Sequence, residues 1–134
     1  MKALIVDDEF TSRLILQKLL LEYGETHVVS TGKEAIDVFS EALLNQEPYD
    51  LVCLDILMPD IDGQEVLREI RAIEDLEGIH GGAGVKVIMI SSLKDKKTIM
   101  TAFKSQCEAY LVKPLDGAKL LEQLTSFGLV DSPS

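Results

Sequence analysis

The segment YDLVCLDILMPDIDG (residues 49–63) joins a strongly apolar run to an aspartate. The run from Leu51 to Leu54 has the continuous apolar character of a strand that is buried on both faces. Asp55 follows directly, before a turn that contains Pro59 and Gly63. Burying a carboxylate costs free energy, so Asp55 needs a specific role at this position. The residues at the other strand ends indicate what that role is.

Short aliphatic runs alternate with segments of helical spacing along the whole chain. We expect strands at 2–6, 27–30, 50–54, 85–90 and 109–112, and helices at 11–23, 32–45, 63–74, 95–106 and 116–127. This alternation predicts an α/β fold, (βα)5, with a doubly wound five-stranded parallel sheet covered by helices on both faces. One domain is expected over residues 1–127, followed by a short C-terminal tail at 128–134.

Polar residues at the predicted helix starts support these boundaries. The expected N-caps are Thr11 or Ser12, then Thr31 with Glu34 as a capping box, then Asp62, then Asp116. Gly24 is placed to end the first helix, and Asp60 is interpreted as a turn residue. The glycine-rich segment 74–84 predicts a long, mobile loop of unknown role.

Composition narrows the class of protein. A hydrophobic content of 46% excludes a disordered chain, and the net charge of −10 argues against nucleic acid or an anionic membrane as the main partner. No apolar run is long enough to span a membrane. The two cysteines, Cys53 and Cys107, lie in apolar segments and are expected to be buried, reduced thiols of a cytoplasmic protein.

Charged and polar side chains stand at the end of four predicted strands. Asp7, Asp8 and Glu9 follow the first strand, Asp55 follows the third, Ser91 and Ser92 end the fourth, and Lys113 follows the fifth. Because the carboxyl ends of parallel strands meet at one edge of a sheet, we expect these groups to converge there. Glu9 is interpreted either as a solvated loop residue or as a peripheral ligand.

The chemistry of this set favours a magnesium site that accepts an anion. Clustered carboxylates repel one another unless a cation intervenes, and an oxygen-only ligand set suits Mg²⁺. No His or Cys stands at these strand ends, which disfavours zinc or copper. Lys113 and a serine hydroxyl then suit a phosphoryl group that arrives with the metal. We therefore expect this lysine to face a phosphoryl group and not a resting salt bridge.

Four segments resemble the signature blocks of response-regulator receiver domains of two-component signalling. They are LIVDDE (4–9), DLVCLDILMPDIDG (50–63), VIMISS (87–92) and AYLVKP (109–114), and the resemblance extends from residue 2 to about 127. It implies a flavodoxin-like sheet with strand order 2-1-3-4-5. It further implies a stand-alone, chemotaxis-regulator-like module that takes a phosphoryl group from a phosphohistidine and is not an enzyme in its own right.

The resemblance implies a role for each matching residue. Asp55 would be the phosphoacceptor, with Asp8 as direct Mg²⁺ ligand, Asp7 as the second acidic residue of the metal site, and the backbone carbonyl of Leu57 completing it. Lys113 would pair with the phosphoryl oxygens, Ser91 would be the switch hydroxyl and Tyr110 the switch aromatic. The Lys113–Pro114 peptide bond is often cis in this family.

Two apolar residues flank the expected phosphorylation site. Leu57 and Leu93 stand two positions after Asp55 and Ser91, where polar side chains could orient a hydrolytic water. A leucine side chain can neither donate nor accept a hydrogen bond to that water, so we expect a long-lived phosphorylated state.

Two surfaces are expected to bind other proteins. On the first helix, Ile15, Leu16, Leu19, Leu20 and Tyr23 suffice to face the sheet, which leaves an outward stripe of Phe10, Leu14 and Leu21. This stripe is expected to dock a sensor histidine kinase or a histidine phosphotransfer protein. Residues 1–93 carry a net charge of −11, whereas residues 94–119 carry +3. Lys94, Lys96, Lys97 and Lys104 in the second segment are expected to bind a downstream protein, or a second copy when phosphorylated, through the helix 4–strand 5–helix 5 face.

Two alternatives remain open at this point. The chain could be the receiver fragment of a larger regulator. It could also be an Mg²⁺-dependent hydrolase that forms an aspartyl phosphate, although such enzymes place an aspartate two residues after a nucleophile on the first strand. Here Glu9 and Phe10 occupy those positions after Asp7 and Asp8.

Overall fold

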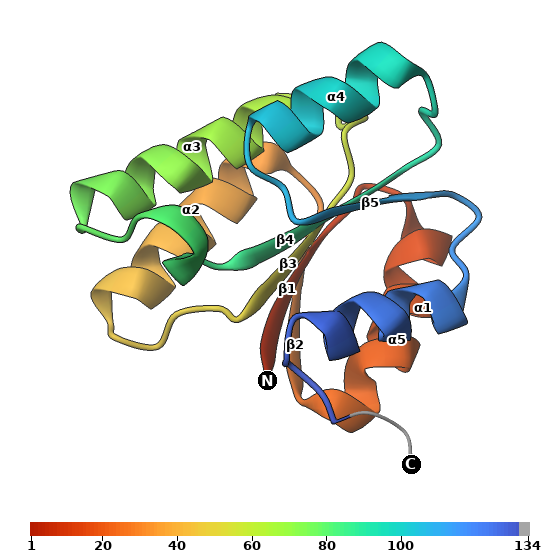
Figure 1. Ribbon diagram of the computed structural model, residues 1–134, viewed down its shortest axis with the longest axis horizontal. Coiled ribbons are helices and arrows are strands. Elements are labelled where there is room, and N and C mark those ends of the chain that lie inside the picture. Colours follow the sequence, from red (N-terminus) through yellow and green to blue (C-terminus); the bar gives the residue numbers. More distant parts are fainter. Residues whose placement is uncertain (132–134) are drawn as a thin grey trace.

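A computed structural model describes residues 1–131, within which five strands alternate with five helices in the expected order (Figure 1). The strands are β1 (Lys2–Val6), β2 (Glu25–Val29), β3 (Leu51–Leu54), β4 (Lys86–Ser91) and β5 (Ala109–Val112). The helices are α1 (Phe10–Leu20), α2 (Gly32–Leu44), α3 (Gly63–Leu76), α4 (Lys96–Lys104) and α5 (Gly117–Ser126). Two short 3-10 turns, η1 (Leu21–Tyr23) and η2 (Gly81–Ala83), follow α1 and α3.

The sheet is fully parallel and has the order β2-β1-β3-β4-β5, which confirms the predicted flavodoxin-like topology. β1 and β3 are neighbours, and Val6 pairs with Leu54 in their register. The next residue on each strand is an aspartate, Asp7 or Asp55. The register therefore places these two carboxylates side by side at the carboxyl edge of the sheet.

Helices cover both faces of the sheet, with α2, α3 and α4 on one face and α1 and α5 on the other (Figure 1). Along β3, Val52 and Leu54 pack toward the first group of helices, and Leu51 and Cys53 toward the second. All four side chains are buried, as expected for a central parallel strand. The same alternation directs Asp55 toward the face that α1 and α5 cover.

Most helix starts follow the predicted capping chemistry. The side chains of Thr31, Asp62 and Asp116 accept backbone N–H groups in the first turns of α2, α3 and α5. The prediction for α1 was wrong, because the helix begins at Phe10 with Glu9 as N-cap and no side chain bonds the N-terminal amides. The Ser12 hydroxyl instead donates to the Glu9 carboxylate.

Asp60 has a larger role than a turn residue. Its carboxylate accepts the backbone N–H groups of Gly32 at 3.0 Å and Lys33 at 2.9 Å, at the start of α2. These hydrogen bonds lower the pKa of Asp60 to about 2. Asp60 thereby ties the loop after β3, which begins at Asp55, to the N-terminus of a helix 28 residues away in sequence.

The first helix is shorter than predicted and presents a different face. α1 ends at Leu20, and Leu21 belongs to the 3-10 turn η1, so Leu14 and Leu21 do not form one continuous helical stripe. Leu16 and Leu20 are buried against the sheet, but Ile15 is 43% exposed, contrary to prediction. Ile15 lies on the wall of a cavity at the carboxyl edge.

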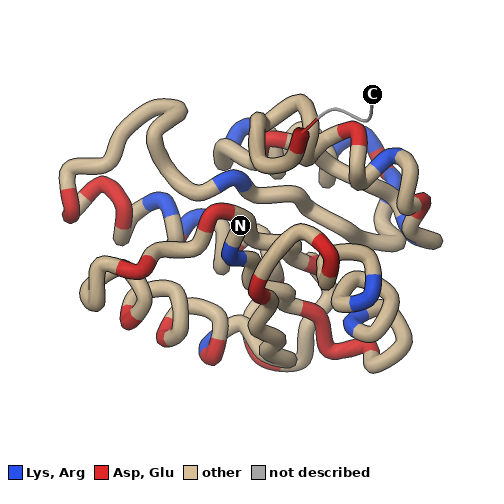
Figure 2. Tube along the Cα trace, turned by 90° about the horizontal axis from the view of Figure 1, so that it is seen from below, with Lys and Arg blue, Asp and Glu red and all other residues tan. Residues whose placement is uncertain are grey.

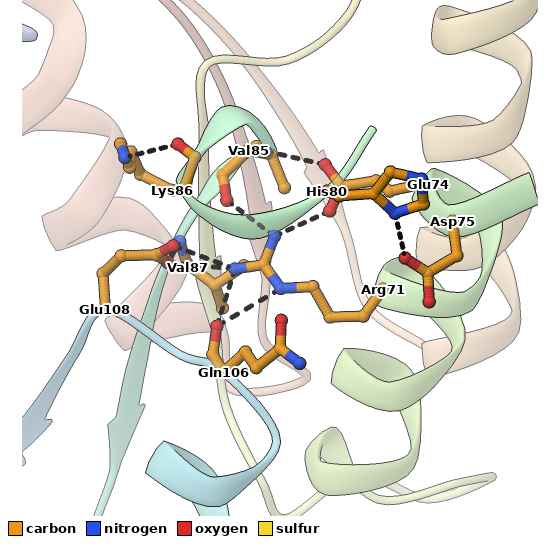
Figure 3. Close-up of polar contacts among 10 residues, drawn as sticks. Arg71, Glu74, Asp75, His80, Val85, Lys86, Val87, Gln106 and Glu108 are labelled. Atoms are coloured by element: carbon orange, nitrogen blue, oxygen red, sulfur yellow. Dashed lines mark hydrogen bonds and ion pairs between the residues drawn. The ribbon is translucent and has the colours of Figure 1, made fainter. Parts of the chain in front are cut away.

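The segment 74–84 begins inside α3 and its two ends are joined by a hydrogen bond, while its mobility stays a prediction. α3 continues to Leu76, and the buried Glu74 carboxylate accepts the Val85 N–H at 2.7 Å. Arg71 lies beside it and donates to Glu74, to Glu108 and to the backbone carbonyls of Val85 and Gln106 (Figure 3). We call Arg71, Glu74 and Glu108 the Arg71 cluster. It lies at the amino edge of the sheet, opposite Asp7 and Asp55.

The remaining general expectations are met in part. Cys53 and Cys107 are both free and buried, and burial raises the pKa of each thiol to about 12. Leu129 and Val130 of the predicted tail pack against the core near α5, while residues 132–134 lie outside the described part of the chain. Among residues 1–131, no helix has the length and apolarity needed to cross a membrane.

Candidate functional site at the carboxyl edge of the sheet

Lys113 lies between two buried carboxylates at the carboxyl edge. Its Nζ is 2.9 Å from Asp7 Oδ2 and 3.0 Å from Asp55 Oδ2, and 3.8 Å from Glu9 Oε1. Asp7 and Asp55 are 1% and 5% exposed. The lysine therefore does form resting ion pairs, which corrects the expectation from the sequence. The Lys113–Pro114 peptide bond is cis.

Three carboxylates form one potential ligand set at this edge. One oxygen each of Asp7, Asp8 and Asp55 lies within 4.8 Å of the others. Asp8 is the exposed member of the set, whereas Asp7 and Asp55 are buried. Asp8, Asp55 and Lys113 line a cavity of about 590 Å³ whose opposite wall is largely apolar and includes Leu16, Ile90, Pro114 and Leu115.

The pKa values of Asp7 and Lys113 reflect their burial and their contact with each other. Burial raises the pKa of Asp7, although the Glu9 amide and Lys113 act in the opposite direction, and the charge of Asp55 raises it further. Burial lowers the pKa of Lys113, but hydrogen bonds to Asp7 and Asp55 outweigh it, so the net shift is upward. One ammonium thus compensates a set of three carboxylates only in part.

This donor set fits Mg²⁺. It consists of carboxylate oxygens, two of them fixed by burial and the third facing the cavity, and a hard cation of this kind binds a few carboxylates and retains several waters. Burial is the main reason that the pKa of Asp7 is raised, and a divalent cation would also offset the smaller contribution from the charge of Asp55. The Leu57 carbonyl stays a predicted ligand, while the Leu57 N–H donates to Asp55 Oδ1 at 3.3 Å.

The two predicted switch residues meet at Leu93. The fully buried Ser91 hydroxyl accepts the Leu93 N–H at 3.3 Å, and the Tyr110 hydroxyl donates to the Leu93 carbonyl at 2.6 Å. Alternation along β4 places Ser91 with Met89 on the α3–α4 face, whereas its neighbour Ser92 lines the cavity near Asp55. The predicted hydrogen bond from Ser91 to a phosphoryl group stays a prediction.

The two leucines beside the site differ in their surroundings. Leu57 is 50% exposed and lines the cavity together with Asp55, the predicted phosphoacceptor. Leu93 is partly buried and packs against the core cluster beneath α3 and α4. Only Leu57 is therefore in a position to cover Asp55, and the symmetrical role that the sequence suggested for Leu93 is not supported.

Both predicted partner surfaces are accessible. Phe10 is 68% exposed, Leu14 41% and Leu21 72%, and the α1 residues between them continue into the cavity wall. On the other side, Lys94, Lys96, Lys97 and Lys104 are exposed on and before α4, where Met100 is 59% exposed among them. Figure 2 shows acidic residues spread over the trace, which makes this lysine group distinct in a chain of net charge −10.

One contact at the site was not anticipated from the sequence. Arg13 Nη1 donates to the backbone carbonyl of Asp7 at 3.0 Å. A single arginine on an amphipathic helix gives no sequence signal for such a contact, because solvated arginines have the same pattern. The uncertain Glu9 proves to be 62% exposed at its side chain and a distant neighbour of Lys113.

Comparison with known proteins agrees with this arrangement. A family model described as response regulator receiver domain matches residues 3–125. The chain belongs to the response regulator receiver domain family. Receiver domains are signalling modules of two-component phosphorelays, and this receiver has their five-stranded fold and acidic edge.

Curated relatives differ in how much of their length this receiver matches. It is 38% identical over 120 residues to a probable transcriptional regulator, ycf27, of Guillardia theta, covering 89% of this chain and 42% of the relative. It is 29% identical over 125 residues to the chemotaxis protein CheY of Bacillus subtilis, covering 92% and 93%. The chain thus spans less than half of the first relative and nearly all of the second.

Solved structures give the same fold. The CheX–CheY–BeF3–Mg complex of Borrelia burgdorferi matches with a TM-score of 0.77 at 29% identity, covering 94% of this chain and 87% of the other. The receiver domain of the histidine kinase CKI1 of Arabidopsis thaliana, complexed with Mg²⁺ and BeF3⁻, matches with a TM-score of 0.80 at 28% identity, covering 93% and 89%. Both of those structures hold magnesium, consistent with the acidic cluster here.

Proposed function

We propose that this receiver accepts a phosphoryl group on Asp55 from the phosphohistidine of a sensor kinase or a histidine phosphotransfer protein. The observation that carries the proposal is the position of Lys113 between Asp7 and Asp55, beside an exposed Asp8 and an open cavity. A buried aspartate that faces such a cavity next to a cation is suited to nucleophilic attack on phosphorus.

The transfer step places specific demands on the chain's own residues. An Asp55 carboxylate oxygen forms a bond to phosphorus while the phosphorus–nitrogen bond to the donor imidazole breaks, and its electron pair returns to the imidazole. Lys113 loses one carboxylate partner as Asp55 is esterified, and its ammonium is then free to neutralise a phosphoryl oxygen. Asp7, Asp8 and Asp55 would hold Mg²⁺, which when bound neutralises charge on the phosphoryl oxygens.

Signal output is proposed to pass through Ser91 and Tyr110. Both residues are hydrogen-bonded to the backbone of Leu93, in the loop that leads into α4. A Ser91 hydroxyl drawn toward a phosphoryl group would release the Leu93 N–H and so disturb the loop that also binds Tyr110. The exposed lysines of α4 would then contact an acidic downstream protein, or a second copy of this chain.

The stretch around α1 is proposed as the docking surface for the phosphodonor. Phe10 and Leu14 are exposed beside the cavity that contains Asp55, so an apolar helix placed on them would lie next to the nucleophile. The match over 93% of the length of CheY supports a receiver that acts alone, and the match over 42% of ycf27 supports a receiver within a longer regulator.

The proposal is tested by chemical phosphorylation. Intact-mass measurement after incubation with acetyl phosphate and MgCl₂ should show one added phosphoryl group on the wild type and none on Asp55→Asn. Asp37→Asn, which removes an exposed carboxylate from α2, is the matched control and should be labelled like the wild type. Full labelling of the Asp55→Asn variant, or an unlabelled wild type, would overturn the assignment.

A further inference from the structure

The carboxylate of Asp8 has no side-chain anchor. It is exposed on the cavity wall, and among residues 1–131 no hydrogen bond or ion pair of its side chain is found. Asp7 is different, because Oδ1 accepts the Glu9 N–H at 2.9 Å and Oδ2 faces Lys113 at 2.9 Å. The position from which the Asp8 side chain projects is therefore set by the backbone that carries it.

The peptide group between Asp7 and Asp8 is held by Arg13. Arg13 Nη1 donates to the Asp7 carbonyl oxygen at 3.0 Å in a partly buried contact. Within the described part of the chain, no other hydrogen bond to the C=O or N–H of this peptide group is found. A charged donor makes a stronger hydrogen bond than a neutral one, so this contact favours one orientation of the peptide.

Arg13 is itself held in place for this contact. It lies in the second turn of α1, where its backbone N–H bonds the Glu9 carbonyl at 3.1 Å. Its guanidinium carbon is 5.8 Å from the centre of the Phe10 ring, which gives the side chain a partner on the same helix. The helix thus presents a preoriented donor to the loop that contains both acidic residues.

We propose that Arg13 is a positioning residue, which orients the Asp7–Asp8 peptide and thereby directs the Asp8 carboxylate toward bound Mg²⁺. The inference rests on the proposed function of the acidic cluster as a magnesium site. Arg13 acts through the backbone and has no contact with the metal. Its own charge would repel a cation, so positioning and electrostatics predict opposite effects when the arginine is removed.

Calorimetric titration of the full chain with MgCl₂ tests this. Arg13→Gln should weaken Mg²⁺ binding by about tenfold, the lower end of what loss of an outer hydrogen-bond partner costs a metal site. Arg13→Lys retains one donor and should restore part of the affinity. Lys18→Gln removes an exposed positive charge from the same helix without touching the loop, and should leave Mg²⁺ binding unchanged or slightly tighter.

A melting curve for each metal-free variant separates positioning from a general structural role. Support requires weaker Mg²⁺ binding by Arg13→Gln at a melting temperature close to that of wild type. An affinity equal to or tighter than wild type, or a fall in melting temperature with unchanged affinity, would overturn the proposal. If Arg13→Gln does not fold, Arg13→Met decides the matter, because it keeps the apolar stem without a donor and an unchanged affinity in it would count against positioning.

The same data distinguish this inference from the proposed function. A wild type that binds Mg²⁺ and is labelled at Asp55, with an Arg13→Gln variant of unchanged affinity, rejects only the role of Arg13. A wild type that binds no Mg²⁺ rejects both proposals.

Discussion

Two ionic clusters lie at opposite edges of the same sheet, and they differ in how fully protein groups hydrogen-bond their carboxylates. This difference distinguishes a structural cluster from a candidate ligand site. In the Arg71 cluster, Glu74 and Glu108 each bond both Arg71 and a backbone amide, from Val85 and Val87 respectively. At the carboxyl edge, Lys113 pairs with Asp7 and Asp55, and the third carboxylate, Asp8, has no partner among the described residues. The first cluster has its hydrogen-bonding capacity filled by the protein, whereas the second retains capacity for a ligand.

The largest predicted effect comes from breaking the saturated cluster. Arg71→Met should lower the free energy of unfolding by about 3–5 kcal/mol, because it leaves the buried Glu74 carboxylate and the partly buried Glu108 carboxylate without a cation. Arg68→Met is the matched control, since Arg68 pairs with Glu65 three residues before it on the exposed face of α3. Its cost should stay below about 1 kcal/mol.

Urea unfolding of both variants provides the measurement. Similar losses for Arg71→Met and Arg68→Met would show that the Arg71 cluster does not hold the amino edge of the sheet.

A second prediction concerns access of water to the carboxylates at the carboxyl edge of the sheet. Leu57→Asn places a polar group on the cavity wall beside Asp55, where it could orient an attacking water. We expect dephosphorylation to be faster by up to about 10²-fold, the lower range for a positioned polar group. Leu93→Asn is the control, because Leu93 packs against the core and should change the rate little.

Release of phosphate from protein labelled with acetyl phosphate, followed over time, gives both rates. A rate for Leu57→Asn no faster than wild type would mean that Leu57 does not limit the lifetime of the phosphorylated state.

Much of the fold and of the site at the carboxyl edge was predictable from the sequence, because both depend on local patterns. Apolar strands and the residue that follows each are read directly along the chain, and a parallel sheet then brings Asp7, Asp55 and Lys113 together. The strand order and the roles of the site residues came from the resemblance to receiver domains and not from periodicity.

The Arg71 cluster was not predictable from the sequence, because its contacts join distant segments. Arg71 and Glu108 are 37 residues apart, and nothing in either segment indicates the pairing. The same limit applies to Arg13, to Ile15 on the cavity wall, and to Asp60 at the start of α2. Each depends on how a loop or helix is placed in three dimensions after the strands have paired.

A smaller effect tests how closely Glu74 fits against the glycine-rich segment. A Cβ built on Gly84 would lie 2.4 Å from Glu74 Oε1 and 2.6 Å from Oε2, so Gly84→Ala must displace the buried carboxylate from Arg71 and Val85. We expect a loss of about 1–3 kcal/mol, typical of overpacking. Gly82→Ala meets no atom within 4 Å and should be close to neutral. Equal stabilities in urea would show that the segment adapts without strain.

The smallest predicted change has the opposite sign and concerns Asp7. Burial raises the pKa of Asp7 above its ordinary value of 3.8, so the folded state binds this proton more tightly than the unfolded chain does. Stability due to this group is therefore highest below pH 3.8 and falls as the pH rises through the folded pKa. Asp7→Asn removes this loss, and at neutral pH without metal it should raise the free energy of unfolding by about 0.5–2 kcal/mol, the range of typical stabilising substitutions.

Two further properties of Asp7→Asn test whether the ionised carboxylates at the carboxyl edge destabilise the metal-free protein. The gain should disappear in acid, where Asp7 is protonated in both states, and the stabilisation by added MgCl₂ should be weaker than in wild type. Asp37→Asn, on the exposed face of α2, should show neither effect. Thermal melting with and without MgCl₂ across the pH range measures all of these quantities. A loss of stability in metal-free Asp7→Asn at neutral pH would mean that the ion pair with Lys113 outweighs the desolvation of Asp7. The carboxyl edge would then be stabilised by its charges in the resting state, as the Arg71 cluster is, and Mg²⁺ would have no repulsion to relieve.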